Sequence, residues 1–407
     1  MEKLIILNEV FNFIFDDSDE GDSEDDIEVI ERPCKTKKGE EVIPRQTKKI
    51  FKQHLRGQND DSDPDVGLNR GERNQTFAED VVPILPAKNF RQHFRLDPDV
   101  FELICKDIYP FLHKKYGKGR NPLKLDKQLM ITLSYLGSKE GLRTIADRFD
   151  VSISTAWRIV SNVCDAFLKM NGEKKIIKWP TREEAEKTAK HYYATYNLKG
   201  VIGCIDSCHF TIRAPIHSHN SYINKKGTHS VILQAVSNEK MEFVFFYAGE
   251  CGSLDDASLL LKSGLEAKIN SGNFKISEDQ HLLGDSSYPP KPWLITPYRD
   301  SNGFRDEQIF FNTIHSECLD DIKRSFGVLK GRFRRLHYID CLRTAATTKF
   351  IAACSILHNI CLRNEDFPDE YVAIDIEENE KECYKEHDNF ASSSSSKRDM
   401  LMNILHE

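Results

Sequence analysis

The stretch Gly200-Val-Ile-Gly-Cys-Ile-Asp-Ser-Cys-His-Phe-Thr-Ile-Arg-Ala-Pro215 contains the residue around which this chain is organised. Its composition is typical of a buried strand, yet one carboxylate, Asp206, stands among the apolar side chains. A buried carboxylate that stays ionised and unpaired costs several kcal/mol. Asp206 therefore needs a cation, a hydrogen-bonding neighbour or a metal ion beside it.

A second carboxylate occupies a similar position in the segment His281-Leu-Leu-Gly-Asp-Ser-Ser-Tyr-Pro289. Asp285 ends a short apolar run there and precedes a Tyr-Pro-Pro turn. Two carboxylates at the ends of two strands are a common way to hold Mg²⁺ for phosphoryl transfer. A complete site of this kind would need a further contribution from the rest of the chain.

The totals limit the class of protein. With 407 residues, 39% of them hydrophobic, the chain has enough apolar material for a large core in two or three domains. Its net charge of −7 is uneven, because acids cluster at 16–26 and 374–388 and bases at 323–349. Eleven irregularly spaced cysteines indicate reduced thiols of an intracellular protein and no zinc site. No apolar run approaches the roughly 18 residues of a membrane span, so we expect a soluble protein.

Composition and periodicity divide the chain into four regions. Residues 1–88 are polar and charged after a short apolar start, and we predict them to be largely disordered. Residues 89–175 show helical periodicity, and residues 176–365 mix β-rich and helical runs. The latter pattern is typical of an α/β domain with a mixed sheet flanked by helices. Residues 366–407 are acidic and then serine-rich, and we predict a disordered tail.

Within the α/β region we expect a long strand followed by a hairpin, two short strands and a helical end. The expected strands are 201–212, 231–236, 243–248, 282–284 and 293–297, and the expected helices are 256–263, 306–315, 319–331 and 343–362.

The helical region contains a candidate helix-turn-helix. Two predicted helices, at 144–149 and 152–170, are joined by a tight turn. In this interpretation the exposed start of the second helix contacts DNA, while Ala156, Trp157, Val160 and Val163 pack inward. The DNA-facing residues would be Ser154, Thr155 and Arg158. An ordinary three-helix bundle explains the same pattern.

A basic block near the C-terminal end of the α/β region fits contact with a phosphate backbone. It comprises Lys323, Arg324, Lys330, Arg332, Arg334, Arg335, His337 and Arg343, and Lys225 and Lys226 add to it. The alternative is a solvated helix face without a nucleic-acid partner.

Five blocks of residues, in this order, resemble the Harbinger (PIF) transposases and the nucleases domesticated from them, which belong to the DDE superfamily and have an RNase H-like core. The resemblance runs from about Phe94 to Leu362, and the family carries its helix-turn-helix in the corresponding helical region. The blocks are Gly203-Cys-Ile-Asp206 with His209 and Ile212; Asn224-Lys-Lys-Gly227, Ser230, Gln234-Ala-Val236, Gly252-Ser253 and Asp256; Leu283-Gly-Asp285, Tyr288-Pro289 and Thr296-Pro-Tyr298; Phe326-Gly-Val-Leu-Lys-Gly-Arg-Phe333; and Leu357-His-Asn-Ile-Cys361.

The chain departs from the family at the third acid. The resemblance makes Asp206 and Asp285 metal ligands for Mg²⁺ or Mn²⁺, but the family's catalytic Glu precedes the Arg of a block that here reads Ile322-Lys-Arg-Ser-Phe-Gly327. DDE chemistry needs three carboxylates because two Mg²⁺ ions carry four positive charges. We expect the Lys323 ammonium to lie near the two aspartates and balance their charge without a metal.

Three further positions differ: Ser207 and Ser287 replace a usual Gly, and Asp255 a usual His. On a helix, the acid best placed to replace the missing Glu is Asp320, one turn before Lys323 and roughly 60° around the axis. Asp321 points almost the opposite way, and Glu317 is nearly two turns away. Asp256 is matched in the family but is expected to orient its loop.

We therefore predict a domesticated Harbinger-type transposase that retains the nuclease fold and binds DNA but has impaired cleavage. A working Mg²⁺-dependent endonuclease using Asp206, Asp285 and Asp320 is one alternative, and a protein-interaction module that does not bind DNA is another. The resemblance further implies a nuclear location, with the cytoplasm as an alternative, and a separate Myb-like DNA-binding partner protein.

Overall fold

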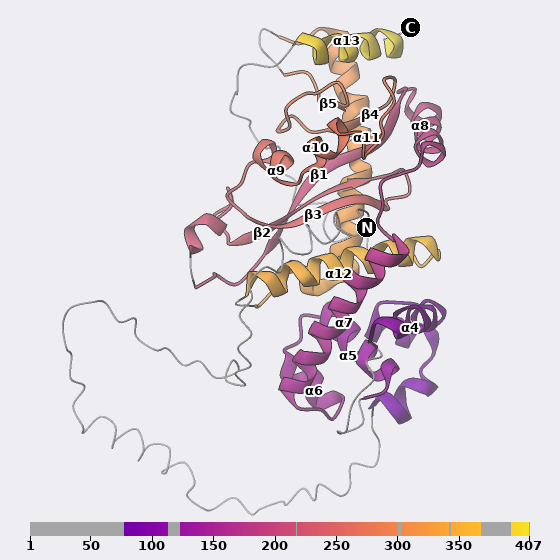
Figure 1. Ribbon diagram of the computed structural model, residues 1–407, viewed down its shortest axis with the longest axis vertical. Coiled ribbons are helices and arrows are strands. Elements are labelled where there is room, and N and C mark those ends of the chain that lie inside the picture. Colours follow the sequence, from indigo (N-terminus) through magenta and orange to yellow (C-terminus); the bar gives the residue numbers. More distant parts are fainter. Residues whose placement is uncertain are drawn as a thin grey trace, which may run out of the picture. The chain divides into compact units, whose positions relative to one another are not determined.

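The computed structural model describes residues 77–112, 123–216, 218–299, 303–341, 343–367 and 392–406 (Figure 1). The disorder expected for residues 1–76 and the acidic runs at 16–26 and 374–388 lie outside this part of the chain. All described residues belong to one structural unit, so the division between 89–175 and 176–365 stays a prediction.

A mixed five-stranded sheet has the order β3-β2-β1-β4-β5. β1 (Val201–Thr211), β2 (Ser230–Ser237) and β3 (Phe243–Cys251) form an antiparallel meander, and β4 (His281–Gly284) and β5 (Leu294–Ile295) extend it in parallel from β1. Three antiparallel strands continued by two parallel ones are the RNase H-like arrangement. The predicted α/β fold and its strands are confirmed.

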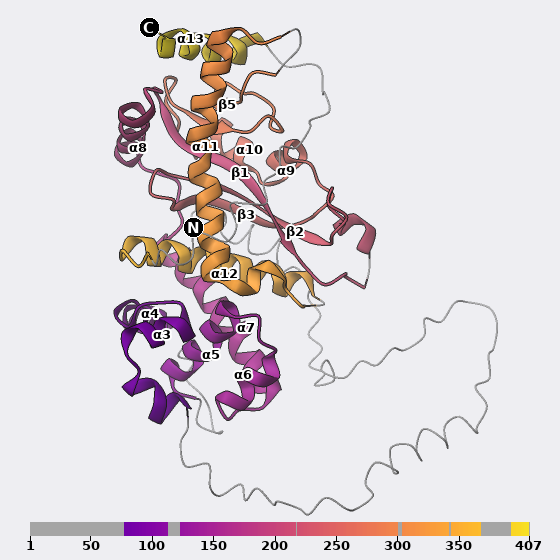
Figure 2. The same ribbon diagram turned by 180° about the vertical axis from the view of Figure 1, so that it is seen from behind.

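Each face of the sheet has its own core because side chains alternate along a strand. Cys204 and Phe210 of β1 face α11 (Asp306–Arg332) and α12 (Thr344–Arg363), which contact β1 and β3 respectively. Ile205 belongs to the opposite core, to which α9 (Asp256–Lys262) and α10 (Leu265–Asn270) contribute. α8 (Arg182–Tyr196) packs beside β1 and begins at a Thr181–Glu184 capping box. Figure 2 shows α11 and α12 from behind.

β1 changes face at Gly203, which has a φ of 156° beside a bulge in its pairing with β4. A Cβ atom at this position would lie 2.6 Å from the carbonyl oxygen of Ser237. Only glycine therefore lets β1 approach β2 this closely. The bulge sets which face the next residues, including Asp206, present to the helices.

α11 is a single helix of 27 residues, whereas the sequence predicted two, at 306–315 and 319–331. The segment between the expected helices contains neither Gly nor Pro, and His315 and Cys318 are both buried. Continuous burial of one helix face removes any reason for a break. α11 therefore spans the sheet in one piece.

The helices before the sheet begin earlier than predicted. Short turns η2 (Phe77–Val81) and η3 (Val82–Ile84) precede α3 (Ala87–Phe94), α4 (Pro98–Leu112), α5 (Leu125–Gly137), α6 (Leu142–Arg148) and α7 (Ile153–Lys174). The Phe77 ring packs edge-on against Phe149, with centroids 5.4 Å apart, and Val82 is buried. The predicted disorder of residues 1–88 is therefore wrong for residues 77–88.

α12 joins the helical layer to the sheet. The Trp157 ring of α7 meets Phe350 edge-on at 5.8 Å, and the Lys349 ammonium lies 2.8 Å from the Asp165 carboxylate. α12 is long and apolar enough to cross a membrane by length and composition, which corrects the expectation that no segment is. However, 78% of that window is buried inside the protein, as in the core helix of a soluble protein.

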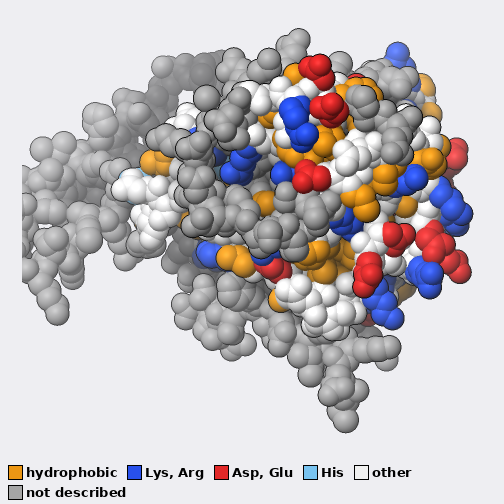
Figure 3. Space-filling model, turned by 90° about the horizontal axis from the view of Figure 1, so that it is seen from above, with side chains coloured by type: hydrophobic (Ala, Val, Ile, Leu, Met, Phe, Trp, Pro, Cys, Tyr) orange, Lys and Arg blue, Asp and Glu red, His pale blue; other side chains and the backbone are white. Residues whose placement is uncertain are grey.

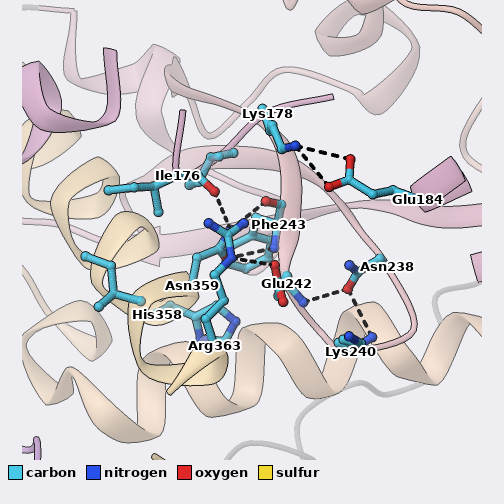
Figure 4. Close-up of polar contacts among 12 residues, drawn as sticks. Ile176, Lys178, Glu184, Asn238, Lys240, Glu242, Phe243, His358, Asn359 and Arg363 are labelled. Carbon is cyan, nitrogen blue, oxygen red and sulfur yellow. Dashed lines mark hydrogen bonds and ion pairs between the residues drawn. The ribbon is translucent and has the colours of Figure 1, made fainter. Parts of the chain in front are cut away.

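The end of α12 holds the turn between β2 and β3 (Figure 4). The Asn359 side chain accepts from the Phe243 N–H at 2.9 Å and donates to the carbonyls of Phe243 and Ile176 at 2.7 and 3.4 Å. Nε2 of His358 lies 2.9 Å from the Met241 carbonyl. The last of the five sequence blocks thus satisfies backbone groups that would otherwise be buried without partners.

The tail also differs from expectation, because α13 (Ser392–His406) is an ordered helix. Leu401, Met402 and Leu405 are buried, and their spacing puts them on one helix face. The disorder predicted for residues 366–407 is therefore wrong for this last segment.

Arg332 at the end of α11 is completely buried. It donates to the Arg95 carbonyl at 2.7 Å and to the Asp366 carboxylate at 3.1 Å, and so joins α11 to the helical layer. Loss of Arg332 would leave the buried Asp366 with only the longer ion pair to Arg91, at 3.3 Å, so Arg332→Met should lower the free energy of unfolding by about 3 kcal/mol. Denaturant unfolding would measure this loss. Arg334→Met, at a half-buried position two residues on, should cost less than about 0.5 kcal/mol; equal losses would contradict the assigned role.

Candidate functional site

The two carboxylates found in the sequence lie side by side because of the pairing of β1 with β4. Ile205 pairs with Gly284 in parallel, which brings the next residue of each segment, Asp206 and Asp285, together. Asp206 alternates with Ile205 and so faces the α11 side of the sheet.

Burial raises the pKa of Asp206 well above its ordinary value, and the negative charges of Asp285 and Asp256 raise it further. Two influences oppose this rise: the Ser207 N–H, which donates to the carboxylate at 2.7 Å, and the positive charge of Lys323. Asp206, Asp256 and Asp285 thus share one poorly solvated region. The charges of Asp256 and Asp285 make ionisation of Asp206 less favourable.

Ser207 and Ser287, which stand where the resemblance leads us to expect glycine, both donate to these acids. The Ser207 hydroxyl donates to Asp256 at 2.5 Å. The Ser287 hydroxyl and N–H donate to the same oxygen of Asp285, at 2.5 and 3.1 Å. Asp255, the third departure, caps the start of α9 by accepting from the Ser258 N–H at 2.8 Å. These substitutions add hydrogen-bond donors where glycine has no side chain.

Tyr288 is a further member of the site that the sequence did not reveal as functional. It is fully buried, and its hydroxyl accepts from Gln234 Nε2 at 3.2 Å. Burial and the charges of Asp256 and Asp206 raise its pKa well above the ordinary value, so it stays protonated. Its place in the Tyr-Pro block was the signal that could have identified it.

Lys323 lies on the α11 side of the site, but its direct partner is Asp320. The Lys323 ammonium is 3.0 Å from the Asp320 carboxylate, and it acts on Asp206 only through its charge. The Asp320 side chain is 54% exposed. Asp321 is buried and accepts from the Tyr192 hydroxyl at 2.8 Å.

The residues present do not fit the two-metal centre of the superfamily. Within the described ranges, no group of three His, Cys, Asp or Glu side chains is arranged to hold a metal ion. Lys323 stands where the resemblance leads us to expect the third ligand, and hydroxyl donors occupy lone pairs of Asp256 and Asp285. Instead, hydrogen-bond donors of the protein and the Lys323 ammonium balance the charge of the neighbouring carboxylates.

The start of α7 presents the predicted DNA-facing residues at the surface. Ser154 and Arg158 are exposed and Thr155 is half-buried, while Ala156, Val160 and Val163 are buried and Trp157 is half-buried. Ser152 caps the helix by accepting from the Thr155 N–H at 3.1 Å. The packing face is as predicted, and contact with DNA stays a prediction.

The basic block is not a single surface. Arg332 and Arg335 are buried, and Arg335 donates to the Tyr135 carbonyl at 3.2 Å with its guanidinium over that ring. Their predicted contact with DNA is therefore wrong. After α11 the chain passes through η5 (Arg334–His337), which contacts α5. At this junction Arg332 and Arg335 donate to backbone carbonyls of the helical layer.

Lys330 is half-buried, with its ammonium 5.3 Å from the centre of the Phe210 ring. Of the remaining predicted contacts, Arg334 is half-buried and Lys225 and Lys226 are exposed.

Asp206→Asn should stabilise the protein at neutral pH. Because the folded-state pKa of Asp206 is raised above 3.8, ionisation opposes folding, and the stability of the parent chain falls as the pH rises above that value. The midpoint of thermal unfolding at pH 7 should rise by a few degrees in the variant, and the difference should vanish in acid. Asp320→Asn, at an exposed carboxylate, is the matched control. Parallel pH profiles for Asp206→Asn and the parent would contradict a raised pKa at Asp206.

Lys323→Glu should create a response to divalent metals. Without metal, the added carboxylate repels Asp206 and loses the pairing with Asp320, so the midpoint of thermal unfolding should fall. Mn²⁺ or Mg²⁺ should restore it by binding the folded state. Lys323→Gln, which removes the charge alone, should show no such recovery, and neither should the parent chain. If metal leaves the Lys323→Glu midpoint unchanged, residue 323 does not face the acids.

Comparison with known proteins points to one family. Residues 205–359 match the family described as DDE superfamily endonuclease. The chain is 28% identical to the ALP1-like protein of Arabidopsis thaliana over 298 residues, covering 69% of this chain and 72% of that one. It is 30% identical to the protein named HARBI1 in Mus musculus over 241 residues, covering 58% and 67% of the two chains. No solved structure matches the chain.

The matched segment begins one residue before Asp206 and ends at Asn359, so it contains both acids, the lysine at the third position and the residues that hold the hairpin. The chain belongs to the Harbinger transposase-derived nuclease family of the DDE superfamily.

Proposed function

We propose that this protein is a domesticated Harbinger-type transposase derivative that binds DNA through an inherited DDE endonuclease fold but has impaired cleavage. The observation that carries the proposal is the Lys323–Asp320 ion pair, which occupies the helix position of the third acid. Asp206 and Asp285 remain, but the donors around them do what metal charge would otherwise do. The displaced-acid alternative loses support, because Asp320 is exposed and paired with Lys323.

DNA binding is supported by the start of α7. Its exposed Ser154 and Arg158 stand in the first turns of a long helix whose other face is buried. A positive helix end and an arginine there favour contact with a phosphate backbone or a base edge. Arg334, Lys225 and Lys226 are the remaining candidates for backbone contacts.

Location and partners follow from the family alone. We infer a nuclear location, as DNA is the ligand, and a separate Myb-like protein as a source of sequence specificity. Mg²⁺ or Mn²⁺ would be the cofactor only if cleavage were retained, and the donor set of the described residues argues against that.

The purified full chain should bind duplex DNA without cutting it. Affinity should fall steeply with salt, because bound phosphates release counterions. Arg158→Ala should lower affinity for every DNA sequence and reduce the slope of the salt dependence by about one charge. Fluorescence anisotropy would measure binding, and supercoiled plasmid with Mg²⁺ or Mn²⁺ would report nicking.

Arg182→Ala is the matched control, because it removes another exposed arginine, on α8, where it pairs with Glu186. A flat salt response in the parent chain would exclude the DNA-binding part of the proposal. Metal-dependent nicking that disappears in Asp206→Asn would instead overturn the loss of cleavage.

A further inference from the structure

The first two of the five sequence blocks meet at the hydroxyl group of Ser230. Ser230 begins β2 and pairs with Thr211 of β1, and His209 stands two residues before Thr211 on the same face of the sheet. Nδ1 of His209 lies 3.0 Å from the Ser230 hydroxyl oxygen, and Nδ2 of Asn224 lies 3.2 Å from the same atom. Ser230 is completely buried. One buried hydroxyl thus joins a histidine of the first block to an asparagine of the second.

Asn224 also organises the tight turn that carries Lys225 and Lys226. Its side-chain oxygen accepts from the backbone N–H groups of Lys226 and Thr228, at 3.0 and 3.1 Å. Because Oδ1 accepts both N–H groups, Nδ2 is the side-chain atom that donates to Ser230. The orientation of the amide is therefore set by the backbone of the turn, on which both lysines are exposed.

These contacts decide which nitrogen of neutral His209 carries the proton. Ser230 accepts from Asn224, whose Nδ2 cannot accept in return, so within the described residues the hydroxyl proton has Nδ1 of His209 as its acceptor. A neutral imidazole that accepts at Nδ1 carries its proton at Nε2. His209 is exposed, unlike the serine behind it. The exposed ring therefore has a donor, Nε2–H, whose orientation a buried hydroxyl holds.

Gly252 of the second block leaves room for this hydroxyl. Its N–H donates to the Ser230 carbonyl at 2.9 Å. A Cβ atom at this position would overlap the Ser230 hydroxyl and lie 2.7 Å from the Tyr222 carbonyl oxygen. Any other residue would therefore displace the group that contacts His209 and Asn224.

The donors lie next to the two acids, on a part of β1 that β4 does not cover. β4 pairs with β1 as far as Ile205, and in the described structure residues 206–210 pair with β2 alone. His209 is three residues beyond Asp206, which corresponds to about 10 Å along a strand. A ligand bound at His209 would therefore lie close to the acids.

Overall charge does not direct DNA to the protein, because the net charge is −7. In the view of Figure 3, the described side chains of both signs are interspersed with apolar ones. Binding of a phosphate therefore depends on local donors, and donors that are held in place beforehand lose less conformational freedom when they bind. The turn and the histidine provide such donors.

We propose that His209, Lys225 and Lys226 form a binding site for backbone phosphates of duplex DNA, with Asn224 and Ser230 as positioning residues. The lysines supply positive charge, and Nε2–H of the histidine supplies a directed hydrogen bond. DNA bound in this way passes the two acids. The inference rests on the proposed DNA binding and adds a second contact surface to the start of α7.

Ser230→Ala tests the positioning role, because it removes one oxygen atom and no charge. At about pH 8, NMR of the full chain with isotope-labelled histidine should show neutral His209 of the parent as the Nε2–H tautomer, and that of the variant as a mixture of both tautomers. Affinity for duplex DNA, measured by fluorescence anisotropy, should fall about 5-fold. Ser237→Ala is the matched control, since it removes a buried hydroxyl of β2 that has no partner within the described residues. It should change neither quantity.

The charges are tested by Lys225→Ala and Lys226→Ala in one chain. This variant should bind DNA at least about 10-fold more weakly, and the slope of the salt dependence should fall by about two charges. Both positions are exposed, so the variant also keeps the site testable if Ser230→Ala does not fold, as judged by thermal unfolding. Inorganic phosphate is a probe that does not require DNA, and it should shift the NMR signals of His209 in the parent and not in this variant.

The outcomes separate this site from the proposed function. DNA affinity that is unchanged in both variants would overturn the site and leave DNA binding intact, and a parent His209 in the Nδ1–H form would overturn the positioning role. A parent chain that binds no DNA would overturn the proposed function. The response of His209 to inorganic phosphate would then support or overturn the phosphate site by itself.

Discussion

The parallel pairing of β1 with β4 imposes the central constraint of this structure, because it places the carboxylates of Asp206 and Asp285 side by side in a sheet covered on both faces. Ionised acids in such a place repel one another and lack water. In the DDE superfamily divalent metals generally relieve this conflict. Here the neighbourhood supplies hydroxyl and amide donors, and a lysine adds positive charge from α11.

Three of the four positions at which the sequence departs from the resemblance, all except Asp255, contribute to the same pattern. Ser207 and Ser287 each donate a hydroxyl hydrogen bond to an acid, and Lys323 stands where the resemblance leads us to expect the third acid. Loss of the third ligand without the two serines would leave the negative charges of Asp206 and Asp285 with fewer groups to balance them. Because all three changes add donors or positive charge, they are mutually consistent with a site stabilised without metal.

Buried cations elsewhere hold the layers together. Arg332 and Arg335 donate to backbone carbonyls and to Asp366 at the junction between α11, the turn that follows it and the helical layer. Arg332 and Arg335 were predicted to contact DNA because they lie in an arginine-rich segment of the sequence, which does not indicate whether a side chain is buried. An arginine neutralises carbonyl dipoles inside a protein as well as phosphates outside it, and only burial separates the two roles.

The sequence alone determined the sheet, because the apolar runs of β1, β2 and β3 are long and regular, and it predicted Asp206, Asp285 and Lys323 as site residues. It could not place α11 as one helix or α13 as a docked one, since both depend on which faces are buried by distant segments. The pairing of Lys323 with Asp320, the burial of Arg332 and the serine donors were likewise decided only by tertiary structure. Local pattern specifies which side chains are available, whereas their partners are set by contacts between residues far apart in the chain.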